Sequence, residues 1–239
     1  EGNSVIQFLN FCMSLFNVLL KFSPRLTMEI KGHIFLMVNL AVSSALPFIP
    51  TVSIFIHAQQ EINLLQFIVR ALDTFRVKSC IDFKVWDTEE YYLNIVKLIG
   101  CWSYVGQVFA NGQNLSIGAG CESHGVVEHE ILHALGFYHE QSRYDRDDYV
   151  DIVFNNIKTG LTLSFLLFVF KCLNNLSSTH GTPYDYFSVM HYNKDAFTNG
   201  NGSTIITIDP KYQDVIGQRL DMSPLDVQEL NLLYKCGKR

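Results

Sequence analysis

The chain has 239 residues, of which 48% are hydrophobic and 17% are charged, and its formal net charge is −5. This composition can bury a sizeable core and excludes an intrinsically disordered chain. Lys and Arg form no block, so nothing in the charge pattern favours nucleic acid as a partner. The length suits a single domain built from two lobes.

The N-terminal segment, residues 1–44, shows no clear hydrophobic period. We interpret it as a signal or pro remnant, or as an artefact of the gene prediction, ahead of a folded domain over residues 45–239. Apolar residues 33–56 have the length of a membrane span, but two prolines divide them into pieces near or below the roughly 17 residues that a span needs. A degraded signal region that runs into a buried strand is therefore favoured over a membrane anchor formed by residues 34–56.

Short strands and one amphipathic helix are predicted in the first half of the chain. The expected strands cover residues 50–56, 80–86, 91–100 and 113–120. Apolar residues of the segment 59–76 recur at spacings of three and four, which predicts a helix with one apolar face. In the strand that follows, the alternation predicts that Ile81, Phe83 and Val85 share one face.

Two further helices are predicted, with mostly irregular chain between them. Residues 122–136 fit a helix that Gly136 can end in a left-handed conformation. The terminal helix begins near Ser223, which can cap it, with Pro224 in the first turn and Asp226 placed favourably for the helix dipole.

The first of these helices carries a metal-ligand pattern. His129 and His133 are four residues apart, so both rings leave one helix face about 6 Å apart along the axis. Glu130 can reach a water without binding the metal, and Gly136 lets the chain turn so that His139 returns as a third ligand. Three neutral imidazoles leave one position of a zinc ion open for water, as a catalytic site requires. A surface helix with scattered histidines does not explain five fixed positions.

The pattern H-E-x-x-H-x-x-G-x-x-H is the metzincin signature, which also needs a methionine turn downstream. The stretch "YDYFSVMHY" supplies that turn with Met190, and Glu140 follows the third histidine. With "GFYHEQSRYDRDDYV", "GCWSYVGQ" and "IGQRLDMSPLDVQELNLLYKC", the chain resembles the astacin family and its hatching-enzyme and meprin-like relatives. The resemblance spans about residues 47–236.

The resemblance implies an α+β, zincin-type fold with a twisted, mostly β first lobe with two helices and an irregular second lobe with a terminal helix. It also implies roles for individual residues. The implied zinc ligands are His129, His133 and His139. Glu130 matches the general base that activates water and passes its proton to the leaving amine. Tyr192 matches a tyrosine that ligates resting zinc and then stabilises the oxyanion, although a buried structural tyrosine is the alternative.

Two further residues are assigned structural roles through the resemblance. Met190 matches the apolar floor under the zinc, where its role is packing. Glu140 matches the residue that anchors the mature N-terminus inside the second lobe.

The cysteines favour an oxidising compartment. The chain has six, at positions 12, 80, 101, 121, 172 and 236, and no C-x-x-C pair. An even count at wide spacing suits disulfides, with buried free thiols as the alternative. The resemblance implies two pairs, Cys101 with Cys121 and Cys80 with Cys236, and leaves Cys12 without a family partner.

One segment departs from the family pattern. Residues 161–179 contain a long apolar run where relatives are usually polar, and Cys172 lies inside it without a family partner. Such a run would be an aggregation hazard if it were exposed to solvent. Translated intron over residues 161–176 is slightly favoured over a buried substitute for the usual loop. Transcript sequencing separates the two.

These observations predict a secreted zinc endopeptidase with one Zn²⁺ per chain. An extended protein or peptide substrate would lie along an edge strand of the sheet. Neither nucleic acid nor stable membrane insertion is expected. The rival interpretation is a non-catalytic zinc-binding protein whose cleft is blocked by the apolar run. The physiological substrate is not specified by these patterns.

Overall fold

The computed structural model describes residues 50–56, 62–158 and 178–237, which belong to one compact unit, Ile49–Arg239. The expectations for residues 1–44 and 161–176, and for Cys12 and Cys172, lie outside the described residues. The domain boundary expected at residue 45 therefore stays a prediction. Among the helices described, none combines the length and apolarity needed to cross a membrane.

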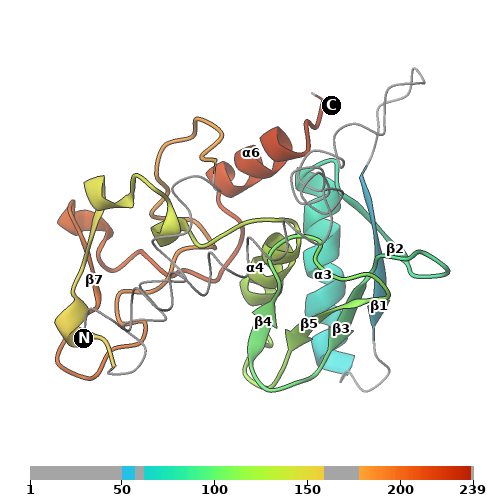
Figure 1. Cartoon of the computed structure of the whole chain (residues 1–239), viewed down its shortest axis with the longest axis horizontal. Coiled ribbons are helices and arrows are strands. Elements are labelled where there is room, and N and C mark those ends of the chain that lie inside the picture. The colour runs from blue at the N-terminus through green and yellow to red at the C-terminus, as the bar shows by residue number, and fades with distance from the viewer. Residues whose placement is uncertain (1–49, 57–61, 159–177, 238–239) are drawn as a thin grey trace, which may run out of the picture. The chain divides into compact units, whose positions relative to one another are not determined.

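The first lobe, residues 51–134, is a five-stranded sheet with two helices (Figure 1). Its strands are β1 Thr51–Ile56, β2 Asp82–Val85, β3 Leu93–Val96, β4 Cys101–Ser103 and β5 Gln113–Ile117, in the spatial order β2-β1-β3-β5-β4. The pairs β1–β2, β1–β3 and β3–β5 are parallel, whereas β4 is antiparallel to β5 and forms an edge. The helices are α3 Ile62–Lys78 and α4 His124–Ala134.

All four predicted strands and the amphipathic helix are present. One detail is wrong: Phe83 is buried, but Val85 is 83% exposed, because β2 is an edge strand that ends there and no element covers its last residue. The three residues of β4 were not predicted as a strand. They are too few to show an alternation, and their pairing with β5 is what makes them extended.

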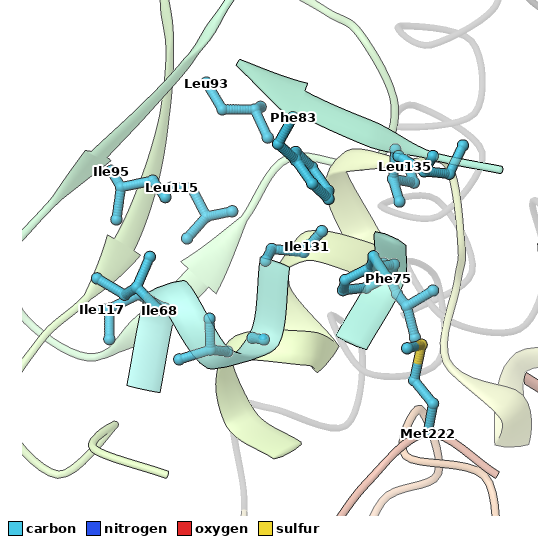
Figure 2. Close-up of a cluster of buried hydrophobic side chains, with 14 of the residues drawn as sticks. Ile68, Phe75, Phe83, Leu93, Ile95, Leu115, Ile117, Ile131, Leu135 and Met222 are labelled. Atoms are coloured by element: carbon cyan, nitrogen blue, oxygen red, sulfur yellow. The ribbon is translucent and has the colours of Figure 1, made fainter. Parts of the chain in front are cut away.

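The core of the first lobe lies between the sheet and the two helices. Figure 2 shows side chains of the strands and of both helices meeting in one cluster. Phe75 of α3 and Ile131 of α4 are fully buried there with Leu115 of β5. The ring of Phe75 meets Phe83 edge-on with centroids 5.8 Å apart. Burial of a side chain of this size is worth about 1.5–3 kcal/mol, so this core fixes α4 against the sheet.

The described residues of the second lobe, 137–158 and 178–236, have little regular structure apart from the terminal helix. Its elements are β6 Val150–Ile152, β7 Ile205–Thr207, four three-residue 3-10 turns within the described residues and α6 Pro224–Leu233. The two strands pair antiparallel. Tyr149 stacks on Tyr184 and Tyr186 on Tyr212, with ring centroids 4.6 and 4.1 Å apart. These rings form a second, smaller apolar cluster.

Helix α6 begins as predicted. The Ser223 side chain accepts hydrogen bonds from the backbone N–H groups of Leu225 and Asp226, and the Asp226 carboxylate accepts one from the backbone N–H of Ser223. This is a capping box, and Pro224 occupies the first turn.

Two disulfides are present among the described residues, in the pairing that the resemblance implies. Cys101 is bonded to Cys121 across 20 residues. Cys80, just after α3, is bonded to Cys236, just after α6, across 156 residues. The second bond ties the first lobe to the end of the second.

Candidate active site

Helix α4 positions three of the predicted site residues, His129, Glu130 and His133, and all three are buried. A helix with ionisable side chains in the interior is unusual unless these groups serve a purpose. The helix stops as predicted, because Gly136 adopts φ +104° and the backbone N–H of Phe137 bonds back to the carbonyl of Leu132. This turn directs the chain towards His139.

The three histidines meet at one point. A nitrogen of each ring lies within 4.8 Å of the others, and His133 Nε2 is 3.2 Å from His139 Nε2. Their ring centroids are 4.6 to 5.2 Å apart. Nitrogen atoms converging at this spacing match the donor set of a three-histidine metal site.

Backbone carbonyls orient two of the rings. His129 Nδ1 lies 2.8 Å from the carbonyl oxygen of Val189, and His133 Nδ1 lies 2.7 Å from that of Phe137. Each Nδ1 therefore carries a proton and donates it, which leaves each Nε2 with a free lone pair. The free lone pair of His133 faces His139 Nε2 across 3.2 Å, a spacing at which the two nitrogens can share a cation.

Burial also keeps the imidazoles neutral. Burial lowers the pKa of His133 to about 4, although the hydrogen bond to the carbonyl of Phe137 acts to raise it. Burial also lowers the pKa values of His129 and His139 well below 6.5. Neutral imidazole is the form that binds zinc. The residues present thus fit a zinc ion.

Glu130 lies in the same buried region, with 4% of its surface exposed. Burial raises its pKa to about 8, and the opposing effect is the charge of Arg219. Its Oε2 has no hydrogen-bond partner among the described residues. A buried carboxyl oxygen without a donor is available to a water or a substrate.

Tyr192 comes from the second lobe and packs its ring on His139, with centroids 4.2 Å apart. Its backbone N–H donates to Gln141 Oε1 at 2.9 Å. Burial raises the pKa of Tyr192 to about 12, so its phenol stays protonated at neutral pH. The structure thus brings Tyr192 to the histidine cluster.

The turn around Met190 is held by α6. Asp226 accepts hydrogen bonds from Ser188 Oγ at 2.6 Å and from the backbone N–H of Val189 at 2.9 Å. The carbonyl of Val189 in turn faces His129 Nδ1. Met190 is buried, and its carbonyl accepts from the backbone N–H of Glu140 at 3.2 Å.

Glu140 is buried and faces the second lobe. Its Oε1 accepts from the backbone N–H of Asp185 at 2.7 Å and from Arg143 Nη1 at 3.3 Å. Burial raises its pKa, although the positive charge of Arg143 acts in the opposite direction. The anchoring role implied for Glu140 stays a prediction.

Three residues near the site were not predicted. Arg219 donates through Nη1 to the carbonyl of His191 at 2.9 Å, and its charge acts on Glu130 and Tyr192. His191 Nε2 and Tyr184 Oη share a hydrogen bond of 2.7 Å. Gln141 Oε1 accepts the hydrogen bond that fixes the backbone of Tyr192. All three lie in stretches that carry the family resemblance, but only the fold shows what they touch.

Comparisons with known proteins agree with this geometry. A family model described as Astacin, a peptidase family, matches residues 50–235. Meprin A subunit beta of Rattus norvegicus is 49% identical over 176 residues, which cover 74% of this chain and 24% of that protein. Zinc metalloproteinase nas-6 of Caenorhabditis elegans is 40% identical over 174 residues, 73% of this chain and 49% of that protein. The chain thus spans about a quarter to a half of the length of these relatives.

A solved structure shares the fold. High choriolytic enzyme 1, a hatching enzyme zinc-protease from Oryzias latipes, superposes with a TM-score of 0.70 at 36% identity, over 78% of this chain and 90% of that chain. The match confirms the predicted α+β, two-lobe fold. Together with the buried three-histidine cluster and the family match over most of the length, it shows that the chain belongs to the astacin family of peptidases.

Proposed function

We propose that this chain is a secreted zinc-dependent endopeptidase that hydrolyses protein or peptide substrates with one zinc ion per chain. The observation that carries the proposal is the convergence of three imidazoles, two buried and one half-buried, beside Glu130, whose Oε2 accepts no hydrogen bond from a described residue. Family membership supports the same chemistry, because the similar proteins include a zinc metalloproteinase and a hatching enzyme zinc-protease.

His129, His133 and His139 would hold the zinc ion, each through the ring nitrogen that faces the other two rings. A zinc ion there supplies Lewis acidity, which makes water a better nucleophile and a carbonyl a better electrophile at neutral pH. The backbone carbonyls of Val189 and Phe137 keep two of the rings in the required tautomer.

Glu130 would act as the general base and then as the general acid. Its carboxylate takes a proton from the attacking water and gives it to the amine nitrogen that leaves. Burial raises its pKa to about 8 even against the charge of Arg219, and a divalent cation close by favours the ionised form that a base requires. Arg219 acts in the same direction as the cation.

Tyr192 would stabilise the oxyanion. Its phenol stays protonated at neutral pH, because burial raises its pKa to about 12, and it can donate a hydrogen bond to the oxygen that becomes negative. The contact of its ring with His139 keeps it beside the metal-binding group.

The substrate would bind in an extended conformation along β4. Within the described part of the chain this strand pairs with β5 alone, so its other edge is available for hydrogen bonds to a peptide. The backbone N–H of Gly106, which follows β4, donates to the carbonyl of His133 at 2.8 Å. That bond ties the edge strand to the helix that carries the histidines.

An extracellular location is supported by the two disulfides, because such bonds form and persist in oxidising compartments. The fold shared with a hatching enzyme zinc-protease supports the same location.

The variant Glu130→Gln tests the proposal, because glutamine keeps the shape of the side chain but cannot take up a proton. We expect unchanged zinc content and a loss of casein turnover of about 100-fold or more. Activity close to wild type in a zinc-loaded sample would contradict the general-base role. A wild-type protein that binds zinc but cleaves nothing would support the rival, a non-catalytic zinc-binding protein.

A further inference from the structure

A second group of metal-binding side chains lies at the first turn of α4. His124 Nε2, a carboxylate oxygen of Glu128 and one of Asp221 lie within 4.8 Å of one another. His124 Nε2 is 2.9 Å from Glu128 Oε1 and 3.8 Å from Asp221 Oδ1. Thr74 Oγ1, from α3, lies 3.3 Å from the same nitrogen. None of these residues belongs to the three-histidine site.

Glu128 is the unusual member of this group, which we call the α4 N-terminal cluster (Thr74, His124, Glu128 and Asp221). Its surface is fully buried. Its Oε2 accepts from the backbone N–H of Met222 at 2.8 Å, whereas its Oε1 lies 2.9 Å from His124 Nε2 in a geometry that makes no hydrogen bond. A buried carboxylate oxygen without a hydrogen bond is costly unless a cation or a proton lies beside it.

The charges of the cluster also favour a cation. Two carboxylates face each other, and the positive charges that act on the cluster are those of Arg70 and Lys78. Lys78 Nζ donates to Asp221 Oδ1 at 2.6 Å. The ammonium neutralises one negative charge of two, and it lies on Asp221, not on the buried Glu128. His124 Nδ1 has no hydrogen-bond partner among the described residues, so the ring meets the cluster through Nε2, which faces both carboxylates.

The cluster can be reached from solvent. A hollow of about 780 Å³ is lined by His124 and Asp221 together with residues of α3, among them Thr74 and Lys78. Asp221 is half exposed and Lys78 is 29% exposed at the side chain, so both can move to admit an ion. Glu128 lies behind them as the fixed ligand.

We propose that the α4 N-terminal cluster is a second metal site, which binds a divalent transition-metal ion of the zinc type through His124, Glu128 and Asp221. One imidazole and two carboxylates suit Zn²⁺. Calcium is a poor match, because it takes six to eight oxygen ligands and does not favour imidazole. Lys78 is the internal competitor of the ion for Asp221.

An ion in this position would join α4 to the segment that precedes α6. The two are already in close contact: a Cβ added to Gly125 would lie 2.3 Å from the backbone oxygen of Arg219, and Met222 bonds to Glu128. The ion would add Asp221 to this contact through a ligand bond, so its binding should stabilise the junction of the two lobes.

Metal counting tests the proposal. The full chain is stripped with a chelator, reloaded with Zn²⁺, passed through a desalting column at micromolar free zinc and analysed for zinc per chain. We expect two ions in wild type and one in His124→Asn and in Asp221→Asn. The control His180→Asn, a partly exposed histidine outside both clusters, should keep two. One ion in every protein, or two in both cluster variants, would overturn the proposal.

The variant Lys78→Met keeps the test decisive if a cluster variant fails to fold. Removal of the competing ammonium should tighten the weaker site for Zn²⁺ by roughly tenfold or more. Competition with a fluorescent zinc indicator measures this affinity. An unchanged or weaker affinity would mean that the cluster is not a metal site. Lys78 and Asp221 would then form an ion pair, and a proton would bridge the carboxyl groups of Glu128 and Asp221.

Co²⁺ added after the tight site is filled provides an independent signal, since imidazole ligation gives visible absorption and an aqueous ion gives very little.

Discussion

The first lobe packs α3 and α4 on a five-stranded sheet through fully buried aliphatic and aromatic side chains, whereas the second lobe has two paired strands of three residues each. What replaces regular structure in the second lobe is a set of buried polar groups. Asp226, Glu140, Gln141 and Thr204 are all buried there and hydrogen-bonded. The fold of the first lobe is thus specified by its hydrophobic pattern, and the fold of the second lobe by particular hydrogen bonds.

The active site is divided between the lobes in the same manner. The first lobe supplies His129, His133 and Glu130 on a rigid helix. The second supplies Tyr192 and the turn around Met190, which depend on Gln141 and Asp226. Changes in the two lobes should therefore have different effects, and the following predictions run from the largest to the smallest.

The disulfide between the lobes should matter most. Replacement of Cys80 and Cys236 by serine opens a loop of 156 residues, whereas the same change at Cys101 and Cys121 opens one of 20. The loop-entropy relation gives losses of about 5 and about 3 kcal/mol in the free energy of unfolding. Urea unfolding followed by tryptophan fluorescence measures both. Equal losses, or the reverse order, would count against the role of the long bond.

Asp226→Asn should damage the second lobe specifically. The amide has one acceptor oxygen where the carboxylate receives bonds from Ser188 and from the backbone N–H groups of Val189 and Ser223. We expect a loss of about 3 kcal/mol in the free energy of unfolding. The matched control is Asp147→Asn, whose side chain is 82% exposed and should cost less than about 0.5 kcal/mol. Similar losses in the two variants would contradict the importance of this network.

Tyr192→Phe should separate metal binding from turnover. The phenylalanine keeps the ring that packs on His139 but removes the hydroxyl. We expect kcat to fall about 100-fold, with zinc content and KM little changed. Steady-state kinetics on a quenched peptide, with zinc analysis of the same sample, provide the measurement. Wild-type kcat would leave Tyr192 as a structural residue only.

Glu229→Gln should change how stability depends on pH. Burial raises the pKa of Glu229 to about 7, although Thr182 and Arg143 act to lower it. A folded-state pKa above the unfolded value means that this contribution is complete below about pH 4.5 and is lost as the pH rises towards 7. Across that range the variant should lose about 2–3 kcal/mol less in the free energy of unfolding than wild type. Unfolding curves at pH 4.5, 5.5 and 7 test this; equal slopes would contradict it.

The first lobe was largely predictable from the sequence. The spacing of apolar residues is set by the helix and strand periods, so α3 and four of the five strands follow from it. The prediction failed where the conformation or the exposure of a residue depends on neighbouring strands. Val85 is exposed because β2 is an edge strand, and β4 is extended because it pairs with β5. A one-dimensional pattern contains no information about which strand is at an edge.

The site was predictable where its residues are close in sequence. The step from His129 to His133 puts two rings on one helix face, and the turn that Gly136 allows brings His139 back to them. Arg219 lies 80 residues beyond His139 and reaches the site only through the fold. The dependence of His129 on Asp226, through the backbone of Val189, is likewise a product of tertiary packing.

The central claim is that the buried histidine cluster is a working peptidase site. Its most direct test is zinc analysis of the full chain alongside cleavage of quenched casein, with and without a chelator. The account predicts zinc in the three-histidine site, and cleavage that the chelator abolishes and added zinc restores. Cleavage that persists after zinc has been removed, or a zinc-loaded protein without cleavage, would contradict it.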